Sequence, residues 1–445
     1  MKIISNGINT VIAVCGRQKN TEGRAMRPSV FMLKEKADDS LLLYNTLTGE
    51  LLLLDPDEDP DNGVVDPLLI EKWFFVPEDF DEHRFFSQID SVAKMLAPCP
   101  DVLTDFTIFT TTDCNARCFY CYERGAGRMA MSDVIAHDTA SFIARSCKNN
   151  RVSLHWFGGE PLFNSQAIDI ITADLKNAGV EYSSRMISNA YLFDEETVKK
   201  AKENWNLDSV QVTLDGTEEV YNNTKKYIYE NKSAYSIVLE NIQRLLDARI
   251  RVSIRLNLGR SNFDDLMSLA DDLKAYFGSN EGLRVFAALL YDYVGIGHGF
   301  TDRKTAFDAQ KALDDKLLAL GLYRPRLLID EYRVNQCMAS DDRGVTVLPD
   351  GRLGKCEHHI DDDFVGSIYE GVTNTALVKE WKRIKKPGDL CGNCPAFVFC
   401  SKLIDKCPSN QHECGQQDRE RYIDSLKTMM LDTYNNYKQT GEPLK

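Results

Sequence analysis

The pattern of hydrophobic and polar positions changes near residue 104. From there to about residue 321, apolar runs of strand length alternate six times with segments whose apolar residues recur every three or four positions. This alternation predicts strands and helices in series, and hence a parallel sheet. Because six units are too few for a closed eightfold barrel, we predict an α/β fold built on an open, partial (β/α)6 TIM barrel. The predicted strands are 106–111, 151–157, 182–188, 209–215, 251–258 and 283–290, and the predicted helices are 132–147, 165–179, 194–205, 236–249, 263–278 and 303–321.

The two ends of the chain follow other patterns. Residues 40–55 (SLLLYNTLTGELLLLD) predict two strands around a turn at Thr48–Gly49, and residues 66–76 and 85–96 predict helices. Residues 418–438 predict a closing helix. The resulting domain boundaries are an N-terminal α+β domain (1–103), the barrel (104–310), a bridging segment (311–336), a cysteine-rich domain (337–415) and a C-terminal helix (416–445).

Composition limits the class of function. The chain is 43% hydrophobic and 27% charged, which is typical of a globular protein. Its net charge of −14 argues against binding to nucleic-acid phosphates or to an anionic membrane surface. The N-terminus lacks the features of a signal peptide, and no stretch reaches the ~20 apolar residues of a spanning helix. We therefore expect a cytoplasmic protein with no nucleic-acid or membrane partner.

The 13 cysteines need an explanation other than disulfides, which are rare in the cytoplasm. Cys15, Cys99 and Cys147 are scattered and are interpreted as small buried apolar residues. The other ten form two groups, one at residues 114–121 and one between residues 337 and 414. Such grouping indicates metal ligands.

The first group lies in the stretch TTDCNARCFYCYERG, directly after the first predicted strand. Thiolates suit iron–sulfur clusters or zinc, and three of them, Cys114, Cys118 and Cys121, leave one metal position for a small molecule. With Tyr120 before the last cysteine, this spacing resembles the radical S-adenosylmethionine (SAM) enzymes. The resemblance implies that the three thiolates hold a [4Fe–4S] cluster whose fourth iron binds SAM. It also implies reductive cleavage of SAM to a 5′-deoxyadenosyl radical that abstracts a hydrogen atom.

Further matches to this family occur at the carboxyl ends of the next predicted strands. GGEP (158–161) ends the second strand, ISNA (187–190) the third and TLDG (213–216) the fourth, although Ala190 replaces the glycine that is usual in relatives. On the fifth strand, the polar side chains of Arg255 and Asn257 share one face. The resemblance implies that SAM is bound by Tyr120, Gly158, Gly159, Glu160, Pro161, Ser188, Asn189, Asp215, Arg255 and Asn257.

The second group of cysteines resembles the SPASM domain, an extension of radical SAM enzymes that carries auxiliary [4Fe–4S] clusters. The matching stretches are DGRLGKC and CGNCPAFVFC, although six residues separate Cys400 from Cys407 where relatives usually have three. The resemblance implies three clusters in the whole chain. Auxiliary cluster II would be held by Cys391, Cys394, Cys400 and Cys414, and auxiliary cluster I by Cys337, Cys356 and Cys407. Zinc is the alternative for this region.

Auxiliary cluster I lacks a fourth cysteine ligand. The open position would bind a substrate thiolate, or it would be filled by His358, His359 or water. Glu357, next to Cys356, is a candidate base for the substrate proton, the alternative being a surface acid. Elsewhere, His155 is interpreted as a buried core histidine and Asp361–Asp363 as a solvated loop.

The resemblance also indicates partners and a reaction. Residues 1–103 have the size and composition of a winged-helix-like element that binds a leader peptide by strand addition, or of a structural cap. We predict a radical SAM maturase of a ribosomally made (RiPP) precursor peptide that forms a thioether or carbon–carbon crosslink, with flavodoxin or ferredoxin as electron donor. The alternatives are an anaerobic, formylglycine-generating sulfatase maturase and, from another class, a non-catalytic electron-transfer or zinc-stabilised binding protein.

Overall fold

The computed structural model describes residues 1–5, 23–63, 65–96, 102–123, 127–229, 233–290, 299–324, 326–328, 337–359, 361–383, 386–407 and 414–442. The chain forms two compact units. We call them the terminal unit (Met1–Pro98, Pro325–Cys337 and Arg383–Lys445) and the sheet unit (Cys99–Arg324 and Met338–Lys382). Cys15 and Cys99, for which burial was predicted, lie outside the described residues. Cys147 is buried, as predicted.

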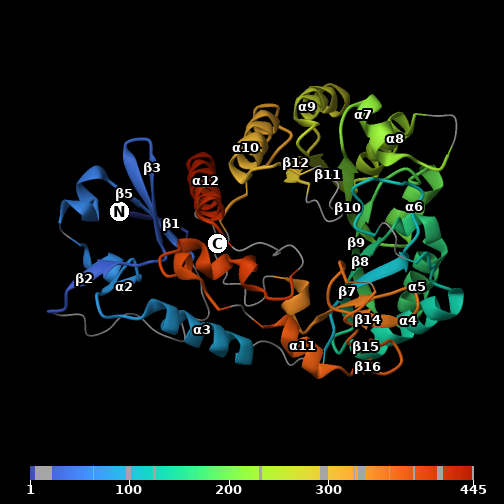
Figure 1. Ribbon diagram of the computed structural model, residues 1–445, viewed down its shortest axis with the longest axis horizontal. Helices are drawn as coiled ribbons and strands as arrows, with labels where there is room; N and C mark the ends of the chain where they lie inside the picture. Colours follow the sequence, from blue (N-terminus) through green and yellow to red (C-terminus); the bar gives the residue numbers. More distant parts are fainter. Residues whose placement is uncertain are drawn as a thin grey trace. The chain divides into compact units, whose positions relative to one another are not determined.

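The sheet unit is built on six parallel strands that lie side by side in sequence order (Figure 1). They are β7 (Asp105–Thr111), β8 (Arg151–Gly158), β9 (Glu181–Ser188), β10 (Leu207–Leu214), β11 (Arg251–Leu258) and β12 (Leu283–Leu289). Successive side chains point to opposite faces of a strand, so Val210 and Val212 of β10 are buried together with Val252 and Ile254 of β11. The opposite face of β11 therefore carries its polar side chains. All six predicted strands are confirmed.

Helices connect these strands and lie along one side of them in Figure 1. They are α4 (Asp133–Ser146), α5 (Ser165–Asn177), α6 (Glu195–Glu203), α7 (Glu218–Lys225), α8 (Ala234–Asp247), α9 (Phe263–Phe277) and α10 (Arg303–Ala319). Ser132 caps α4 by accepting a hydrogen bond from the Ile135 amide at 3.3 Å, and Gly179 follows α5 in the left-handed conformation. Of these helices, α7 was not predicted, because its eight residues carry only a short apolar pattern.

The same sheet continues beyond β7 with segments that the sequence did not predict. β13 (Gly344–Val347) pairs in parallel with β7, and β14 (Arg352–Gly354), β15 (Gly366–Ser367) and β16 (Gly371–Val372) extend it by antiparallel pairing. α11 (Thr375–Trp381) follows. The start of the cysteine-rich segment, for which little regular structure was predicted, thus belongs to the sheet. Strands of two to four residues are too short to leave a periodic signal.

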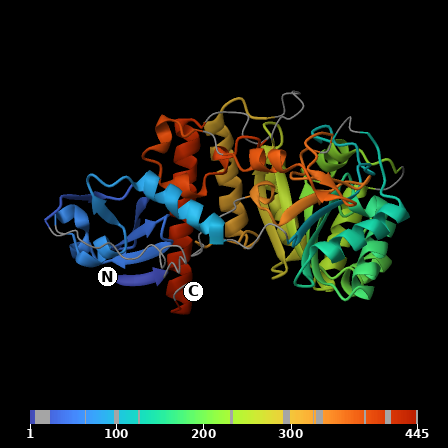
Figure 2. The same cartoon turned by 90° about the horizontal axis from the view of Figure 1, so that it is seen from below.

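The terminal unit contains a four-stranded antiparallel sheet in the order β1-β5-β4-β3. The strands and α-helices of the whole terminal unit are β1 (Lys2–Ser5), β2 (Met26–Pro28), β3 (Met32–Ala37), β4 (Ser40–Asn45), β5 (Glu50–Leu54), α2 (Pro67–Glu71), β6 (Phe75–Pro77), α3 (Glu82–Leu96) and α12 (Gln416–Thr440). The long helix α12 lies beside this sheet (Figure 2). Leu42 and Tyr44 pack in one cluster with Met430 of α12, whereas Leu41 and Leu43 pack in another with residues of α2 and β6. Burial of both faces explains the unbroken leucine runs of β4 and β5.

One predicted helix of the terminal unit is wrong in its extent. Residues 66–76 contain only the five-residue α2, after which Trp73 adopts a positive φ of 64° and the chain enters β6. Pro77 at the end of β6 favours an extended conformation in the residue before it. Residues 75–77 form a strand because they pair with β2. Helical periodicity cannot reveal this pairing, since the two strands are far apart in the sequence. The hairpin at 40–55 and the helices at 85–96 and 418–438 are confirmed.

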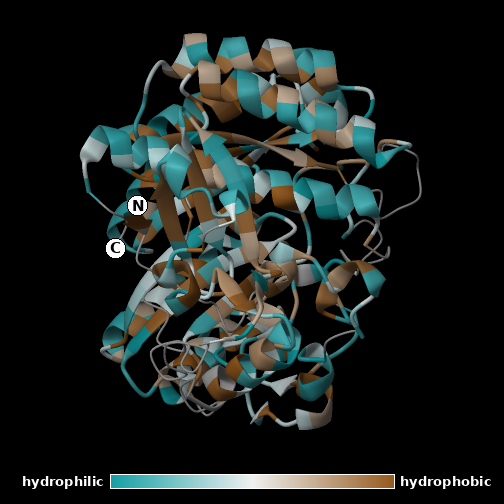
Figure 3. Ribbon diagram, turned by 90° about the vertical axis from the view of Figure 1, so that its left-hand side faces the viewer, coloured by the Kyte–Doolittle hydropathy of each residue, from teal (hydrophilic) through white to brown (hydrophobic). Residues whose placement is uncertain are grey.

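Hydropathy follows this architecture. Figure 3 shows strands that are mainly brown and helices that combine teal and brown surfaces, as expected for helices with one buried side. Within the described ranges, none of the helices has the length and apolar composition that a membrane span requires.

Candidate functional site

The three-cysteine loop leaves the carboxyl end of β7 immediately after Thr111. The Asp113 carboxylate accepts a hydrogen bond from the Cys114 amide at 2.8 Å, and the Cys121 amide donates to the Cys118 carbonyl at 3.3 Å. These bonds curl the loop over the end of the sheet, which is where parallel sheets carry their functional groups.

The environment of the three thiols opposes their ionisation when no cation is present. Burial, and then the charge of Glu160, raise the pKa of Cys114 to about 12. Burial, and then the charge of Glu123, raise the pKa of Cys121 to about 11, and burial also raises the pKa of Cys118. The charges of Cys118 and Cys121 also raise the pKa of Cys114. Partly buried thiols of this kind become thiolates when they bind a metal cation or cluster.

The two glycines of GGEP lie directly against this loop. The Gly159 amide donates to the Thr111 carbonyl at 3.1 Å, and the Glu160 amide donates to the Asp113 carbonyl at 3.0 Å. A Cβ on Gly158 would stand 2.1 Å from the Thr111 oxygen, and one on Gly159 would stand 2.2 Å from the Asp113 oxygen. Gly158 also has a φ of 120°. Only glycine fits at both positions, because the backbone of the cysteine loop occupies the place of a side chain.

Glu160 connects the ends of two strands. Its buried carboxylate accepts hydrogen bonds from the Ser188 hydroxyl at 2.8 Å, from the Asn189 amide at 2.8 Å and from the Leu162 amide at 3.2 Å. Burial raises the pKa of Glu160 to about 7, although these three donors lower it. Pro161 begins the short turn that follows. Glu160, Ser188 and Asn189, predicted from separate motifs, are thus brought together.

Asn189 extends this group to the cysteine loop. Its side-chain amide donates to the Asn115 side-chain oxygen at 2.6 Å and lies 3.8 Å from Cys114 Sγ. The next residue, Ala190, is fully buried with a φ of 61°, in the left-handed region that favours glycine. The position where the sequence departs from its relatives is therefore a strained one.

The other predicted SAM contacts surround a buried ion pair. Lys225 Nζ lies 3.1 Å from Asp215 and donates to the Tyr120 hydroxyl at 3.0 Å, and Asn257 donates to the other Asp215 oxygen at 3.0 Å. The two charged side chains are only 4% and 3% exposed. Although burial lowers the pKa of Lys225, the charge of Asp215 raises it well above its usual value, so the lysine stays charged.

Lys225 is a site residue that the sequence did not reveal. It ends the unpredicted helix α7, and Cys118 Sγ lies 4.0 Å from its carbonyl oxygen. Its neighbour Lys226 is exposed, so no local pattern separates the buried lysine from the surface one.

A cavity of about 330 Å³ lies at the carboxyl ends of β10 and β11, beside this ion pair. Nearby, Asn257 Oδ1 and Arg255 Nε are buried without a hydrogen-bond partner among the described residues. Buried polar atoms of this kind usually have a partner, so a polar ligand is expected here. The lining of the cavity includes Phe119, Tyr120, Asp215, Asn257, Asn262 and Leu290.

The loop after β14 approaches the cysteine loop as well. The Tyr122 hydroxyl donates to the Glu357 carbonyl at 3.5 Å, and the rings of Tyr122 and His358 lie 4.4 Å apart. Glu357 is partly buried, whereas the alternative interpretation was a surface acid. Tyr122, which follows Cys121 directly, is a second contact that the sequence did not single out.

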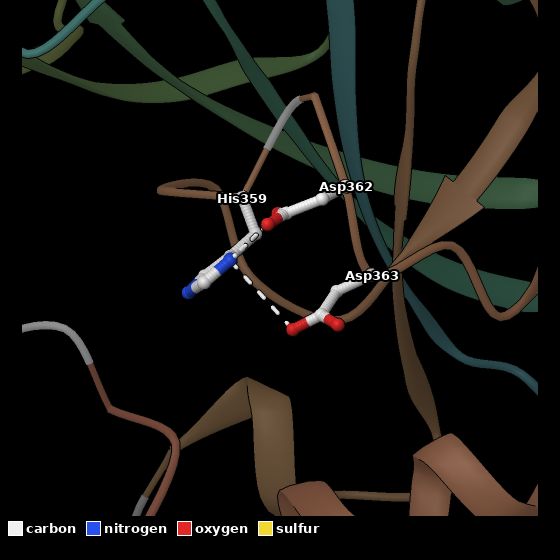
Figure 4. Close-up of side chains that lie close together, drawn as sticks. All are labelled: His359, Asp362 and Asp363. Carbon is white, nitrogen blue, oxygen red and sulfur yellow. Dashed lines mark hydrogen bonds and ion pairs between the residues drawn. The ribbon is translucent and has the colours of Figure 1, made fainter.

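In the same loop, His359 lies beside two aspartates (Figure 4). Its Nδ1 lies 2.9 Å from Asp362 and 3.7 Å from Asp363. Asp361 and Asp362 are exposed, as expected for a solvated loop, and Asp363 is partly buried. One imidazole and two carboxylates can bind a cation, but their mutual pairing explains the arrangement equally well.

The cysteines of the second group are divided between the units. Cys391, Cys394, Cys400 and Cys414 are in the terminal unit, where burial raises the pKa of Cys400 to about 11 and the charges of the other three add to it. Their assignment to one cluster stays a prediction. The three residues predicted for auxiliary cluster I are distributed as follows: Cys356 is in the sheet unit, and Cys337 and Cys407 are in the terminal unit.

His155 is partly rather than fully buried. It lies opposite Arg185 of β9, and burial, with the charge of Arg185, lowers its pKa to about 3. It is at the end of the sheet remote from the cysteine loop, beside a cavity of about 150 Å³.

The carboxyl end of this parallel sheet therefore carries three partly buried thiols and a cavity, an arrangement that suits a metal–thiolate site. Residues 108–273 match the radical SAM superfamily, a range that contains the cysteine loop and every predicted SAM contact. Residues 108–273 thus form a radical SAM domain, and this match indicates an enzyme. A comparison with curated protein sequences gave no match.

Several solved structures have a similar fold. A histidine-tagged form of anSMEcpe with bound AdoMet has a TM-score of 0.57 and 16% identity, over 76% of this chain and 98% of that chain. SuiB of Streptococcus suis bound to S-adenosylmethionine has a TM-score of 0.51 and 12% identity, over 84% of this chain and 95% of that one. SuiB bound to its precursor peptide SuiA has a TM-score of 0.50 and 13% identity, over 85% and 95%.

Proposed function

We propose that this protein is a radical SAM maturase that modifies a ribosomally made precursor peptide. The observation that carries the proposal is the closure of the three-cysteine loop against the glycines of GGEP, where the Asp113 carbonyl would lie 2.2 Å from a Cβ on Gly159. This packing fixes three thiols beside polar side chains from the ends of β9, β10 and β11. The six strands of the sheet would form a partial (β/α)6 barrel around the substrate.

The residues present fit a [4Fe–4S] cluster and SAM. Cys114, Cys118 and Cys121 would hold the cluster, because a bound cation would favour ionisation of these partly buried thiols. When bound, these groups supply the one-electron cleavage that gives a 5′-deoxyadenosyl radical. SAM would be bound by Tyr120, Gly158, Gly159, Glu160, Pro161, Ser188, Asn189, Asp215, Arg255 and Asn257.

Several of these contacts would be indirect. Both Glu160 oxygens already accept hydrogen bonds from the protein, so Glu160 would mainly position Ser188 and Asn189. Asp215 would likewise act through Asn257, whose Oδ1 still needs a donor. Arg255 Nε needs an acceptor and would meet a carboxylate.

The cysteine-rich segment would form a SPASM domain with two auxiliary clusters. Cys391, Cys394, Cys400 and Cys414 would hold the fully ligated one, and Cys337, Cys356 and Cys407 the other. An open position on the second would suit a cysteine thiolate of the peptide. Glu357 would take the substrate proton, from a loop that already touches Tyr122.

The terminal unit would recognise the peptide. Among the described residues, β3 pairs only with β4, and a peptide strand would add along its other edge. A winged-helix-like element that binds a leader in this way needs little sequence specificity. SuiB, which is similar in fold, has been solved with its precursor peptide.

Thioether or carbon–carbon crosslinking is the proposed outcome. A formylglycine-generating sulfatase maturase is the alternative, because anSMEcpe, a sulfatase-maturase structure, is also similar. Sulfatase maturases are expected to carry a further cysteine just before the position of Cys337. Residues 326–336 contain no cysteine, which favours the peptide crosslink over this alternative.

Anaerobic reconstitution followed by iron counting and product analysis tests the proposal. We expect about twelve irons per chain and 5′-deoxyadenosine when SAM and dithionite are supplied. Serine at Cys114, Cys118 and Cys121 should remove about four irons and all product, whereas serine at Cys391 and Cys394 should remove about four irons only. Bound zinc without 5′-deoxyadenosine would contradict the proposal.

A further inference from the structure

The CGNC turn (residues 391–394) is bound by side chains from distant parts of the terminal unit. His83, near the start of α3, has Nε2 2.9 Å from the Gly392 carbonyl oxygen. Because a carbonyl oxygen can only accept a hydrogen bond, Nε2 carries the proton and is the donor. The Arg419 side chain of α12 donates to the next carbonyl, that of Asn393, at 2.5 Å. Both residues between the two cysteines are thus fixed through their carbonyl groups.

Packing fixes the position of the His83 ring. Its centroid lies 4.8 Å from that of the Phe397 ring, which it meets edge-on, and 5.7 Å from that of the Phe31 ring. Both phenylalanines are buried. Cys391 and Cys394 pack against the apolar cluster that contains them. The ring that donates to the turn is therefore held in place by the same cluster that the two cysteines contact.

A second residue of the N-terminal part binds the chain directly after the turn. The Thr46 hydroxyl, which follows β4, donates to the Pro395 carbonyl at 2.6 Å in a buried contact. Thr46 and His83 are 349 and 309 residues away in the sequence from the carbonyls that they bind. Such contacts form only in the folded terminal unit, so the shape of the CGNC turn depends on the N-terminal part of the chain.

We infer that His83 is a positioning residue for the metal site proposed at Cys391, Cys394, Cys400 and Cys414. The inference rests on the proposed function only in that these thiols bind a metal. Loss of a group that orients metal ligands through its hydrogen bonds typically costs about 10–100-fold in metal affinity. The N-terminal part of the chain is therefore needed to hold this metal tightly, a role separate from recognition of a peptide.

The experiment measures the release of iron to the chelator ferrozine from the whole chain after anaerobic reconstitution. Serine at the three cysteines of residues 114–121 removes the first site, so the remaining iron belongs to the second group of cysteines. In this background His83→Phe keeps an aromatic ring but removes the donor, whereas His83→Gln keeps a side-chain N–H. The matched control is His137→Phe, at an exposed histidine of α4 that pairs with Asp174.

We expect His83→Phe to release about four irons at least about tenfold faster than the background, and His83→Gln and His137→Phe to stay within about threefold of it. Further substitution of Cys391 and Cys394 by serine should abolish the effect of His83→Phe, which a general loss of stability would not do. Equal release from His83→Phe and from the background would overturn the inference, as would an effect that persists without these two cysteines.

The proposed function is tested separately, by formation of 5′-deoxyadenosine in protein that keeps the first site. If the second group of cysteines binds zinc in place of iron, the proposed auxiliary clusters are contradicted, and the release of zinc from His83→Phe and from its background then decides the inference. Absence of any metal at Cys391 and Cys394 in the background would overturn it.

Discussion

Replacing Gly159 with alanine tests whether the cysteine loop is held by backbone packing. The new Cβ would stand 2.2 Å from the Asp113 oxygen and 2.5 Å from the Asp113 carbonyl carbon. Side-chain carbons essentially never approach within 3.0 Å of such atoms, so the two backbones must separate by about 0.8 Å. Both groups are main chain, and no rotamer change can relieve the clash.

The magnitude follows from two contributions. Overpacking of this kind costs about 1–3 kcal/mol, and loss of the hydrogen bond from the Glu160 amide to Asp113 adds about 1 kcal/mol. We therefore expect the free energy of unfolding to fall by about 2–4 kcal/mol. Because Asp113 precedes Cys114, the shift also moves one thiol away from the other two, and the iron bound by this loop should fall.

The assay is the denaturation midpoint together with iron per chain after anaerobic reconstitution. Gly127→Ala is the matched control, since a Cβ there meets no atom within 4 Å. If Gly159→Ala keeps both the wild-type midpoint and the wild-type iron content, the packing argument is refuted.

Three further predictions concern stability. Ala190→Gly should stay within about 1 kcal/mol of wild type in calorimetry, because relief of the left-handed strain offsets the lost methyl, whereas Ala190→Val should lose more than about 2 kcal/mol. Lys225→Met should lower the free energy of unfolding by about 3–5 kcal/mol, because it leaves the buried Asp215 carboxylate without its cation. Lys225→Met/Asp215→Asn should recover part of that loss in denaturant titrations. If the two substitutions instead lower the free energy of unfolding additively, the coupling between Lys225 and Asp215 is contradicted. The pKa of His155, about 3 in the fold, lies below its ordinary value of 6.5, so protonation favours the unfolded chain and stability is lost as pH falls below 6.5. Between pH 7.5 and pH 5.0 wild type should lose at most about 2 kcal/mol more than His155→Gln, and equal acid sensitivity of the two would show that His155 is not responsible.

The elements that the sequence predicted are those whose burial repeats along the chain. β8 to β12 bury alternate residues over most of their length, β7 is buried as a continuous apolar run, and each long helix buries one stripe, so the local pattern identifies them. β6 and β13–β16 have two to four residues each, and their structure is decided by pairing with distant strands. Periodicity carries no information about such pairing, and that part of the fold could not be predicted.

The same distinction applies to the site. Cysteines and strand-end motifs could be predicted because they occur in order along the sequence, each at the end of an identified strand. Lys225 could not, because its burial depends on Asp215 and Tyr120, which are 10 and 105 residues away along the chain. The adjacent Lys226 has the same side chain, yet it is exposed and takes a left-handed conformation at the end of α7. What separates a buried cation at the site from a surface cation is therefore the position at which α7 ends, and that position is set by packing of the helix rather than by residue type.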